Sequence, residues 1–384
     1  MYRLGAAVAG LGFMGSTHIE ALRRLGIEVV GLLGSTPEKG RVAAESLGVP
    51  HVYASFDELV ADSTVDVVHI CTPNYLHYPM AKAALRAGKC VVCEKPLTTN
   101  SRESSELVQM AWEARLVAVV NYNLRYYPLC HEARVRVQVG EIGEVRLIHG
   151  GYLQDWLFLS SDWNWRLDPA LGGELRAVAD IGTHWLDMVT WLTGRKVTAV
   201  MADFATFIPN RLKPRQSVDT FAGKMQKPEE AEEVEVRTED YAAVLLTFEG
   251  GARGVLILSQ VSAGRKNHFW WELNGSRASL SWDQEHPNEL WIGHRDRPNE
   301  LVIKDPALMH PDVRSVAGYP GGHAEGYPDT FLQLYKDVYG YIAAGDLSRP
   351  PTFPTFEDGH REIVLCEAIL KSARERRWVE VPDQ

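Results

Sequence analysis

The sequence predicts an α/β protein of two domains. The first is a Rossmann domain with a doubly wound parallel sheet, and the second is built on a large open antiparallel or mixed sheet backed by helices. Three observations support this fold class. A glycine-rich turn follows the first apolar strand, strands and helices then alternate, and short strands dominate beyond residue 196. We place the boundary after residue 125, giving domains 1–125 and 126–384.

Composition narrows the class of protein and of partner. With 384 residues, 45% hydrophobic and 23% charged, the chain has the profile of a soluble globular protein. The net charge is −10 and the basic residues are scattered, which argues against nucleic acid or anionic membrane as partners and leaves small molecules. No stretch is long enough to span a membrane, and five cysteines give no disulfide framework, so a cytoplasmic location is expected.

Residues 3–9 read as the first strand, and residues 10–15 follow with the pattern GxGxxG before an amphipathic helix. Gly10 permits a tight turn, Gly12 lets a pyrophosphate approach the backbone, and Gly15 lets the helix pack on the strand. A dinucleotide is therefore expected at this turn, next to Phe13 and Met14. The same run could resemble a signal peptide, but its glycines and its continuation into a helix favour a strand and turn.

The second strand, residues 27–33, ends without the Asp or Glu that usually binds the ribose of NAD. Gly34 stands there instead, and Ser35, Thr36, Lys39 and Arg41 could bind a 2′-phosphate. NADP is therefore somewhat favoured over NAD as the cofactor. Ser-Thr-Pro is also an ordinary helix start, and that interpretation stays open.

The alternation continues with strands at 65–71, 89–93 and 116–122 and helices at 75–87 and 101–115. Polar clusters follow the three strands, and in a parallel sheet their carboxyl ends would line one crevice. Pro96 must end its strand, which presents Lys95 at that edge. The clusters are Cys71, Thr72, Pro73, Asn74 and His77; Glu94, Lys95 and Pro96; and Asn121, Asn123 and Arg125. Cys90 and Cys93 point to opposite faces of a strand, so they are expected to be core residues, and no metal site is expected.

The second half begins with a helix at 128–139, a strand at 144–153 and a loop rich in aromatic residues. Asp180 and His184 follow, four positions apart, so both lie on one face if the segment is helical. An acid beside a histidine suits a general base, whereas a helix cap and a packed histidine are the alternative. The candidates for substrate contact in the loop are Trp156, Trp163, Trp165 and Arg166.

The rest of the chain is predicted to form strands at 196–207, 241–248, 254–260, 268–274, 278–283 and 289–293, with a hairpin turn at 249–252. Residues 208–238 are polar and acid-rich and are predicted to be an exposed loop. Residues 310–329 contain His323 just before a helix and could equally reach a substrate or serve packing. Helices at 329–343 and 357–376 and an edge strand at 378–381 complete the fold.

The motifs described above, in this order and spacing, resemble those of the glucose-fructose oxidoreductase, inositol dehydrogenase and rhizopine-catabolism (Gfo/Idh/MocA) family. They are GxGxxG, Thr72-Pro73-Asn74-x-x-His77, Glu94-Lys95-Pro96 and Asn123-x-Arg125. The resemblance implies that Lys95 lies beside the nicotinamide and that Pro96 is cis. It also implies that Asp180 and His184 face this lysine across the crevice, and that the second sheet joins subunits into dimers or tetramers.

The expected function is therefore a nicotinamide-dependent dehydrogenase acting on a secondary hydroxyl of a sugar, glycoside or cyclitol. His184 is expected to act as the base, Asp180 to set its charge and position, and Lys95 to donate to or relay from the same hydroxyl. Two alternatives stay open. One is a glycosidase that oxidises its sugar transiently, and the other is a regulatory sensor that binds a dinucleotide without catalysis.

Overall fold

The computed structural model describes residues 4–215 and 231–382. The chain forms two compact units, and each draws on separate stretches of sequence. Unit 1 comprises Met1–Asn123, Ala170–Gly173 and Thr330–Ile363, whereas unit 2 comprises Leu124–Pro169, Glu174–Asp329 and Val364–Gln384. In the described ranges, no helix combines the length and apolar character that crossing a membrane requires.

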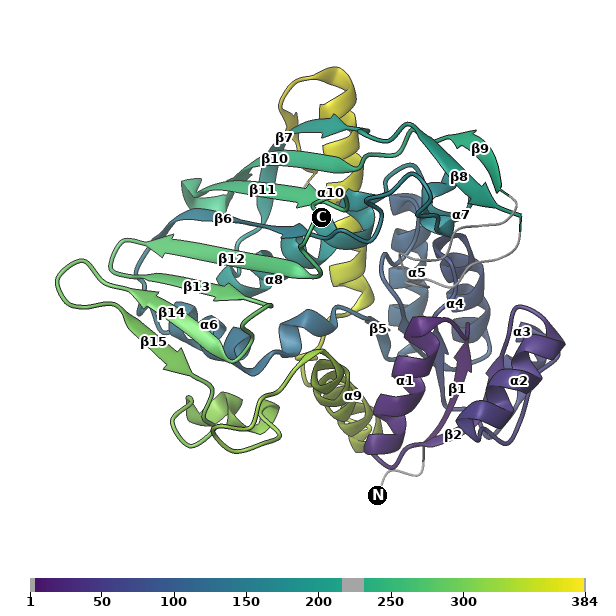
Figure 1. The fold of residues 1–384 in the computed structure, drawn as a ribbon. Coiled ribbons are helices and arrows are strands. Elements are labelled where there is room, and N and C mark those ends of the chain that lie inside the picture. The colour runs from purple at the N-terminus through teal and green to yellow at the C-terminus, as the bar shows by residue number, and fades with distance from the viewer. Residues whose placement is uncertain (1–3, 216–230, 383–384) are drawn as a thin grey trace. The chain divides into compact units, whose positions relative to one another are not determined.

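Unit 1 contains the predicted parallel sheet, with strand order β2-β1-β3-β4-β5 (Figure 1). Its strands are β1 (Gly5–Ala9), β2 (Glu28–Leu33), β3 (Val67–Ile70), β4 (Cys90–Cys93) and β5 (Ala118–Val120). The helices that follow them in the chain are α1 (Phe13–Arg24), α2 (Pro37–Leu47), α3 (Phe56–Ala61), α4 (His77–Arg86) and α5 (Ser101–Ala114). Every residue of β1 and β3 is buried, as expected for parallel strands covered on both faces.

Unit 1 also includes most of α9 (Tyr327–Ala344), although this helix lies far along the chain. The helix contributes Phe331, Tyr335 and Tyr339, which are buried. The Tyr335 hydroxyl donates to Asn121 Oδ1, and the Tyr339 hydroxyl is hydrogen-bonded to His69 Nε2. Such long-range polar contacts leave no periodic pattern in the sequence.

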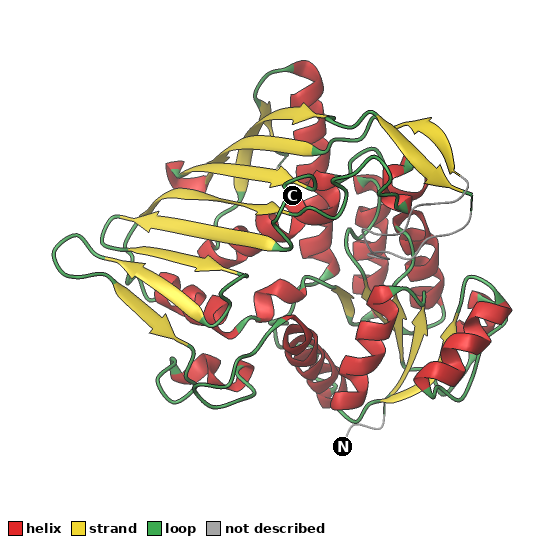
Figure 2. Ribbon diagram, viewed as in Figure 1, coloured by secondary structure: helices red, strands yellow, loops and turns green. Residues whose placement is uncertain are grey.

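Unit 2 contains a nine-stranded sheet in the order β15-β14-β13-β12-β6-β11-β10-β7-β16 (Figure 1). Figure 2 shows its strands in yellow. The strands are β6 (Val145–Leu153), β7 (Val197–Ala205), β10 (Tyr241–Phe248), β11 (Arg253–Ser259), β12 (His268–Gly275), β13 (Ser279–Asp283), β14 (Glu289–Gly293), β15 (Glu300–Ile303) and β16 (Val379–Glu380). The sheet is mixed rather than purely antiparallel, because β6 inserts between β11 and β12 and runs parallel to β11. Hydrophobic alternation cannot reveal that insertion, because either direction buries the same residues.

One face of the nine-stranded sheet is buried by helices (Figure 1). These helices are α6 (Pro128–Gln138), α8 (Thr183–Thr193) and the second half of α10 (Phe356–Glu375). Strand β10 shows the resulting alternation, since Val244 and Leu246 are buried while Leu245 between them is exposed. The predicted alternation in this region is therefore confirmed.

All five cysteines are free. Cys93 is fully buried and Cys90 partly buried on β4, and burial raises the pKa of both thiols. The sequence prediction that they are packing residues is confirmed.

The predicted exposed loop at 208–238 is wrong in part. The strands β8 (Asn210–Pro214) and β9 (Ala231–Glu235) pair antiparallel, while residues 216–230 lie outside the described part of the chain. Arg211 of β8 is fully buried, and its Nη2 donates to Asp240 Oδ1 at 2.9 Å. Arg176, also fully buried, donates to the same carboxylate. The pairing of β8 with β9 was not predicted from the acid-rich sequence, because these strands bury the charged Arg211 instead of a row of apolar residues.

Asp240 is therefore the anion that two buried cations share. Burial alone would raise the pKa of Asp240, but the charge and hydrogen bond of Arg176 lower it below its ordinary value. We expect Asp240→Asn to lower the free energy of unfolding by about 3–5 kcal/mol, because both guanidinium groups would lose their buried counter-charge. Urea unfolding measures the change, with Asp203→Asn on the exposed side of β7 as the control. A loss below about 1 kcal/mol would contradict the assignment.

Candidate active site

The three glycines of the turn between β1 and α1 differ in the space around them. Gly10 has φ +95°, and a Cβ there would lie 2.4 Å from the Cys71 carbonyl oxygen. A Cβ on Gly15 would lie 2.0 Å from the Gly10 carbonyl oxygen, whereas one on Gly12 would meet no atom within 4 Å. Packing of the turn therefore requires glycine at positions 10 and 15, whereas the space beside Gly12 is open. The first turn of α1 has no side-chain cap and no acidic residue, which suits a pyrophosphate at its N–H groups.

The end of β2 carries the residues predicted to select between NAD and NADP. A Cβ on Gly34 would lie 2.7 Å from the Gly40 nitrogen, so no side chain fits at this position. Thr36 caps α2, accepting from the Lys39 N–H at 3.2 Å, which confirms the helix-start interpretation. Arg41 is paired with Glu38 at 3.0 Å, while Ser35 and Lys39 are exposed.

His77 connects the predicted polar clusters after β3 and β4. Its Nδ1 lies 2.8 Å from the Pro96 carbonyl oxygen and its Nε2 lies 2.8 Å from the Thr72 carbonyl oxygen. The strand ends are joined further by Cys71, whose N–H donates to the Ala9 carbonyl at 2.7 Å. Within unit 1, the polar clusters that follow β3 and β4 therefore lie at one sheet edge, as predicted, and Asn121 of the cluster after β5 bonds to Glu94.

The Glu94-Lys95-Pro96 segment follows β4, and its Lys95-Pro96 peptide bond is cis, as the resemblance implied. Glu94 is 5% exposed, and its Oε1 faces His18 Nε2 at 3.0 Å and accepts from Asn121 Nδ2 at 2.5 Å. Burial opposes ionisation, but the hydrogen bond and charge of His18 bring the net pKa of Glu94 below its ordinary value. Lys95 therefore follows an ionised carboxylate. His18 could not be predicted from the sequence, because a single histidine inside a helix forms no motif.

Asn123 and Arg125 have structural partners. The Asn123 amide donates to Thr330 Oγ1 at 2.7 Å within unit 1. In unit 2, Arg125 forms a buried two-point ion pair with Asp187 of α8, with Nε to Oδ2 at 2.8 Å. These contacts explain their burial, and the roles predicted for them toward a cofactor or substrate stay predictions.

Asp180 and His184 lie at the start of the buried helix of unit 2. Asp180 is in a π-helical turn, η4 (Val178–Gly182), and His184 is in the first turn of α8. Both are helical as expected, and π-helical turns are frequent at functional sites. Asp180 Oδ1 accepts from Arg166 Nε at 3.0 Å and Oδ2 from Gln260 Nε2 at 2.8 Å. The carboxylate is thus held at both oxygens.

The aromatic loop brings part of the predicted substrate group to Asp180. The Arg166 guanidinium lies 4.3 Å from the ring centre of Trp165 and 6.0 Å from that of Trp156. Trp163 packs on the small apolar cluster of Leu157, Leu167 and Val236, as Trp156 also does, and its ring centre lies 5.5 Å from Lys213 Nζ. Within unit 2, the structure therefore groups Trp156, Trp165 and Arg166 with Asp180.

His323 is exposed, and its ring nitrogen Nδ1 lies 3.3 Å from the Gly321 carbonyl oxygen. Glu325, two residues later, is buried and paired with Lys304 at 2.6 Å. Glu325 therefore fixes the loop before α9 through a buried ion pair, while a substrate contact by His323 stays a prediction.

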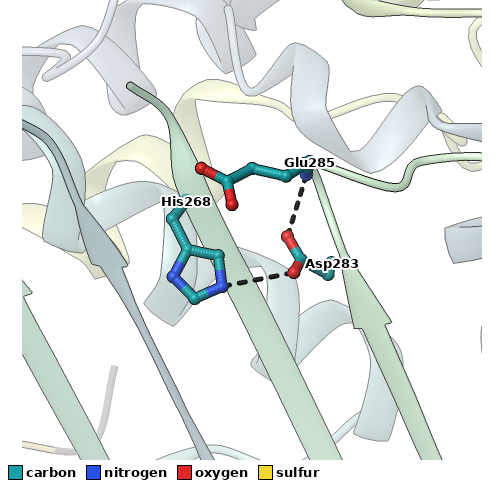
Figure 3. A group of neighbouring side chains, drawn as sticks. All are labelled: His268, Asp283 and Glu285. Carbon is teal, nitrogen blue, oxygen red and sulfur yellow. Dashed lines mark hydrogen bonds and ion pairs between the residues drawn. The ribbon is translucent and has the colours of Figure 1, made fainter. Parts of the chain in front are cut away.

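One group among the described residues has the side chains of a metal site: His268, Asp283 and Glu285 (Figure 3). His268 Nε2 lies 3.2 Å from Asp283 Oδ2, and Glu285 is paired with Arg265 at 2.6 Å. Since Arg265 already neutralises Glu285, ion pairs account for the arrangement, and we assign no metal to it.

Comparisons with known proteins agree with the fold and the motifs. Residues 4–122 match the model of an oxidoreductase family with an NAD-binding Rossmann fold, and residues 130–281 match the GFO/IDH/MocA C-terminal domain. Levoglucosan dehydrogenase of Pseudarthrobacter phenanthrenivorans is 30% identical over 400 residues, covering 100% of this chain and 99% of the relative. The chain therefore belongs to the Gfo/Idh/MocA family. It is an NAD-dependent oxidoreductase.

Two solved structures show the same likeness over almost the whole length. A levoglucosan dehydrogenase in complex with NADH and L-sorbose has a TM-score of 0.89 at 28% identity and covers 100% of both chains. An inositol dehydrogenase homologue from Azotobacter vinelandii, complexed with NAD+, has a TM-score of 0.86 at 27% identity and covers 99% of this chain and 97% of its own.

Proposed function

We propose that this enzyme transfers a hydride between nicotinamide and a secondary hydroxyl of a sugar, anhydrosugar, glycoside or cyclitol. The observation that carries the proposal is Lys95, which follows an ionised, buried Glu94 on the same sheet edge as the open Gly12 turn. Relatives named for levoglucosan and for inositol support the substrate class. The bound nicotinamide would supply the hydride chemistry, and the protein must orient the carbinol and move the hydroxyl proton.

The protein groups have separate roles in this proposal. His184 takes the hydroxyl proton, and Asp180, fixed by Arg166 and Gln260, sets the charge and orientation of that base. Lys95 donates a hydrogen bond to the same oxygen or relays its proton. Trp156, Trp163, Trp165, Arg125 and His323 are the further residues assigned to substrate binding.

A substrate panel tests the proposal. Sugars, anhydrosugars including levoglucosan, glycosides and inositols are each incubated with NAD and with NADP, and the absorbance of reduced nicotinamide is recorded. We expect steady reduction with at least one of these substrates. Release of an aglycone without net reduction would instead identify a glycosidase, and dinucleotide binding without any turnover would identify a sensor.

Cofactor choice can be tested at the end of β2. We propose that NADP binds at least as well as NAD, because no carboxylate opposes a 2′-phosphate there, while the NADH and NAD+ complexes of relatives support NAD. Ser35→Asp should shift the ratio of kcat/KM values toward NAD by about 10-fold or more through like-charge repulsion. Gly34→Asp is unsuitable, because its Cβ would strike Gly40. A strong wild-type preference for NAD, unchanged in Ser35→Asp, would refute the NADP assignment.

We also propose that the outer face of the nine-stranded sheet joins two or four copies of the chain. Apolar side chains are exposed there on three strands: Leu147, Leu245, Val255 and Ile257. Such a face favours burial against another protein surface. Light scattering after size exclusion measures the mass, and Val255→Lys should lower it to that of one chain.

A further inference from the structure

A chain of buried hydrogen bonds runs from α9 to Glu94 through two histidines of unit 1. Tyr339 Oη lies 2.9 Å from His69 Nε2, His69 Nδ1 lies 2.9 Å from His18 Nδ1, and His18 Nε2 lies 3.0 Å from Glu94 Oε1. Both rings are fully buried, and so is Tyr339. The four side chains come from α9, β3, α1 and the end of β4.

The geometry limits where the protons can be. Two ring nitrogens face each other between His18 and His69, so one must donate and the other accept. The His18 Nε2 faces an ionised carboxylate and must donate to it. Burial first, and then the charge of His18, keep the pKa of His69 well below its ordinary value, so His69 stays neutral and carries one N–H.

Two proton arrangements satisfy every one of these bonds, and they differ by one proton. In the first, His18 is neutral, His69 Nδ1 donates to it, and Tyr339 donates to His69 Nε2. In the second, His18 is a cation that donates at both nitrogens, and His69 donates from Nε2 to Tyr339. Conversion takes the Nδ1 proton of His69 to His18 and the hydroxyl proton of Tyr339 to His69, and one added proton completes the Tyr339 hydroxyl.

In the described part of the chain, most of the side chains that contact His18 and Glu94 are uncharged. His18 contacts the rings of Phe331 and Tyr335 from α9, which carry no charge. Asn121 donates to Glu94 and is neutral. The thiols of Cys71 and Cys93 face Glu94, and burial raises the pKa of both, so they stay protonated. Lys95 is a charged neighbour of the carboxylate, and at the other end of the chain of hydrogen bonds Cys90 and Asp66 act on Tyr339.

We propose that Tyr339, His69 and His18 are positioning residues that store one exchangeable proton behind Glu94 and thereby set the net charge beside Lys95. With the proton, the His18-Glu94 pair is neutral; without it, the pair carries one negative charge next to Lys95. The second half of this statement rests on the proposed role of Lys95 in catalysis. The first half concerns the unliganded protein alone.

Imidazole nitrogen NMR of the full chain, labelled with ¹⁵N-histidine, tests proton storage without any substrate. Spectra of His18→Gln and His69→Gln assign the two rings. From about pH 5 to about pH 9 we expect His69 to keep one protonated and one unprotonated nitrogen, and its tautomer to change in His18→Gln. Protonation of both His69 nitrogens in this pH range would overturn the proposal. The same holds if the ¹⁵N signals of each ring stay unchanged in the variant that lacks the other histidine.

The pH dependence of kcat tests the link to Lys95. His18→Gln retains an amide donor for Glu94 but cannot take up a proton, so we expect the profile to move by about one pH unit with unchanged cofactor affinity. Glu94→Gln removes the negative charge of the carboxylate and should move the pH profile of kcat in the opposite direction. His360→Gln, which alters another histidine of unit 1 bonded to Ser104, is the control. If kcat of His18→Gln falls equally at every pH and its pH profile does not move, His18 has a packing role only.

Discussion

A Gly12→Val variant is expected to fold like the wild-type chain and to bind a nicotinamide dinucleotide about 100-fold more weakly. Gly12 has an ordinary φ of −71°, and a Cβ there meets no protein atom within 4 Å, so the substitution costs the apo protein little. The added side chain would occupy the space through which a pyrophosphate reaches the first turn of α1. A loss of about 3 kcal/mol in the binding free energy of the dinucleotide corresponds to this weaker affinity.

Fluorescence titration with NADH and with NADPH measures the affinity, and thermal unfolding confirms that the variant is folded. Gly15→Val is the contrasting variant, because its Cβ would strike the Gly10 carbonyl and destabilise the turn without any ligand. Unchanged affinity in a folded Gly12→Val protein would place the dinucleotide elsewhere.

The features that could be predicted from the sequence are those in which local chemistry dictates the conformation. Gly10 needs a left-handed φ, Pro96 ends β4, and buried parallel strands read as apolar runs, so the turn, the strand end and the first sheet were all predicted. The fold class was confirmed for the same reason. The residue types and their spacing carry this information without reference to distant parts of the chain.

The features that were missed depend on partners far away in the sequence. Arg211 can be buried because Asp240 supplies its counter-charge and the Leu157 carbonyl accepts from it, and His18 matters because Glu94 and His69 lie beside it. Each residue taken alone resembles a surface arginine or a packed histidine. The parallel pairing of β6 with β11 was likewise invisible, because a strand has the same alternation in either direction.

Lys95→Ala and His184→Ala are each expected to lower kcat by about 10²- to 10⁴-fold with little loss of cofactor affinity. This range is what positioned acid-base groups contribute, and neither side chain belongs to the Gly10–Gly15 turn. Initial rates on the substrate found in the panel give kcat, and NADH titration gives the affinity. Lys82→Ala removes a lysine of α4 that is paired with Glu106 of α5. It controls for the general loss of a positive charge and should change kcat less than about twofold.

The double variant Lys95→Ala, His184→Ala is the sharper measurement. If both groups act on one hydroxyl, removing either already disables proton transfer, so the second substitution should add little to the loss. The kcat of the double variant should then lie close to that of the poorer single variant. Two losses that multiply would instead show separate roles. Full activity of His184→Ala would make His184 a packing residue of α8, consistent with its 8% exposure beside Tyr152.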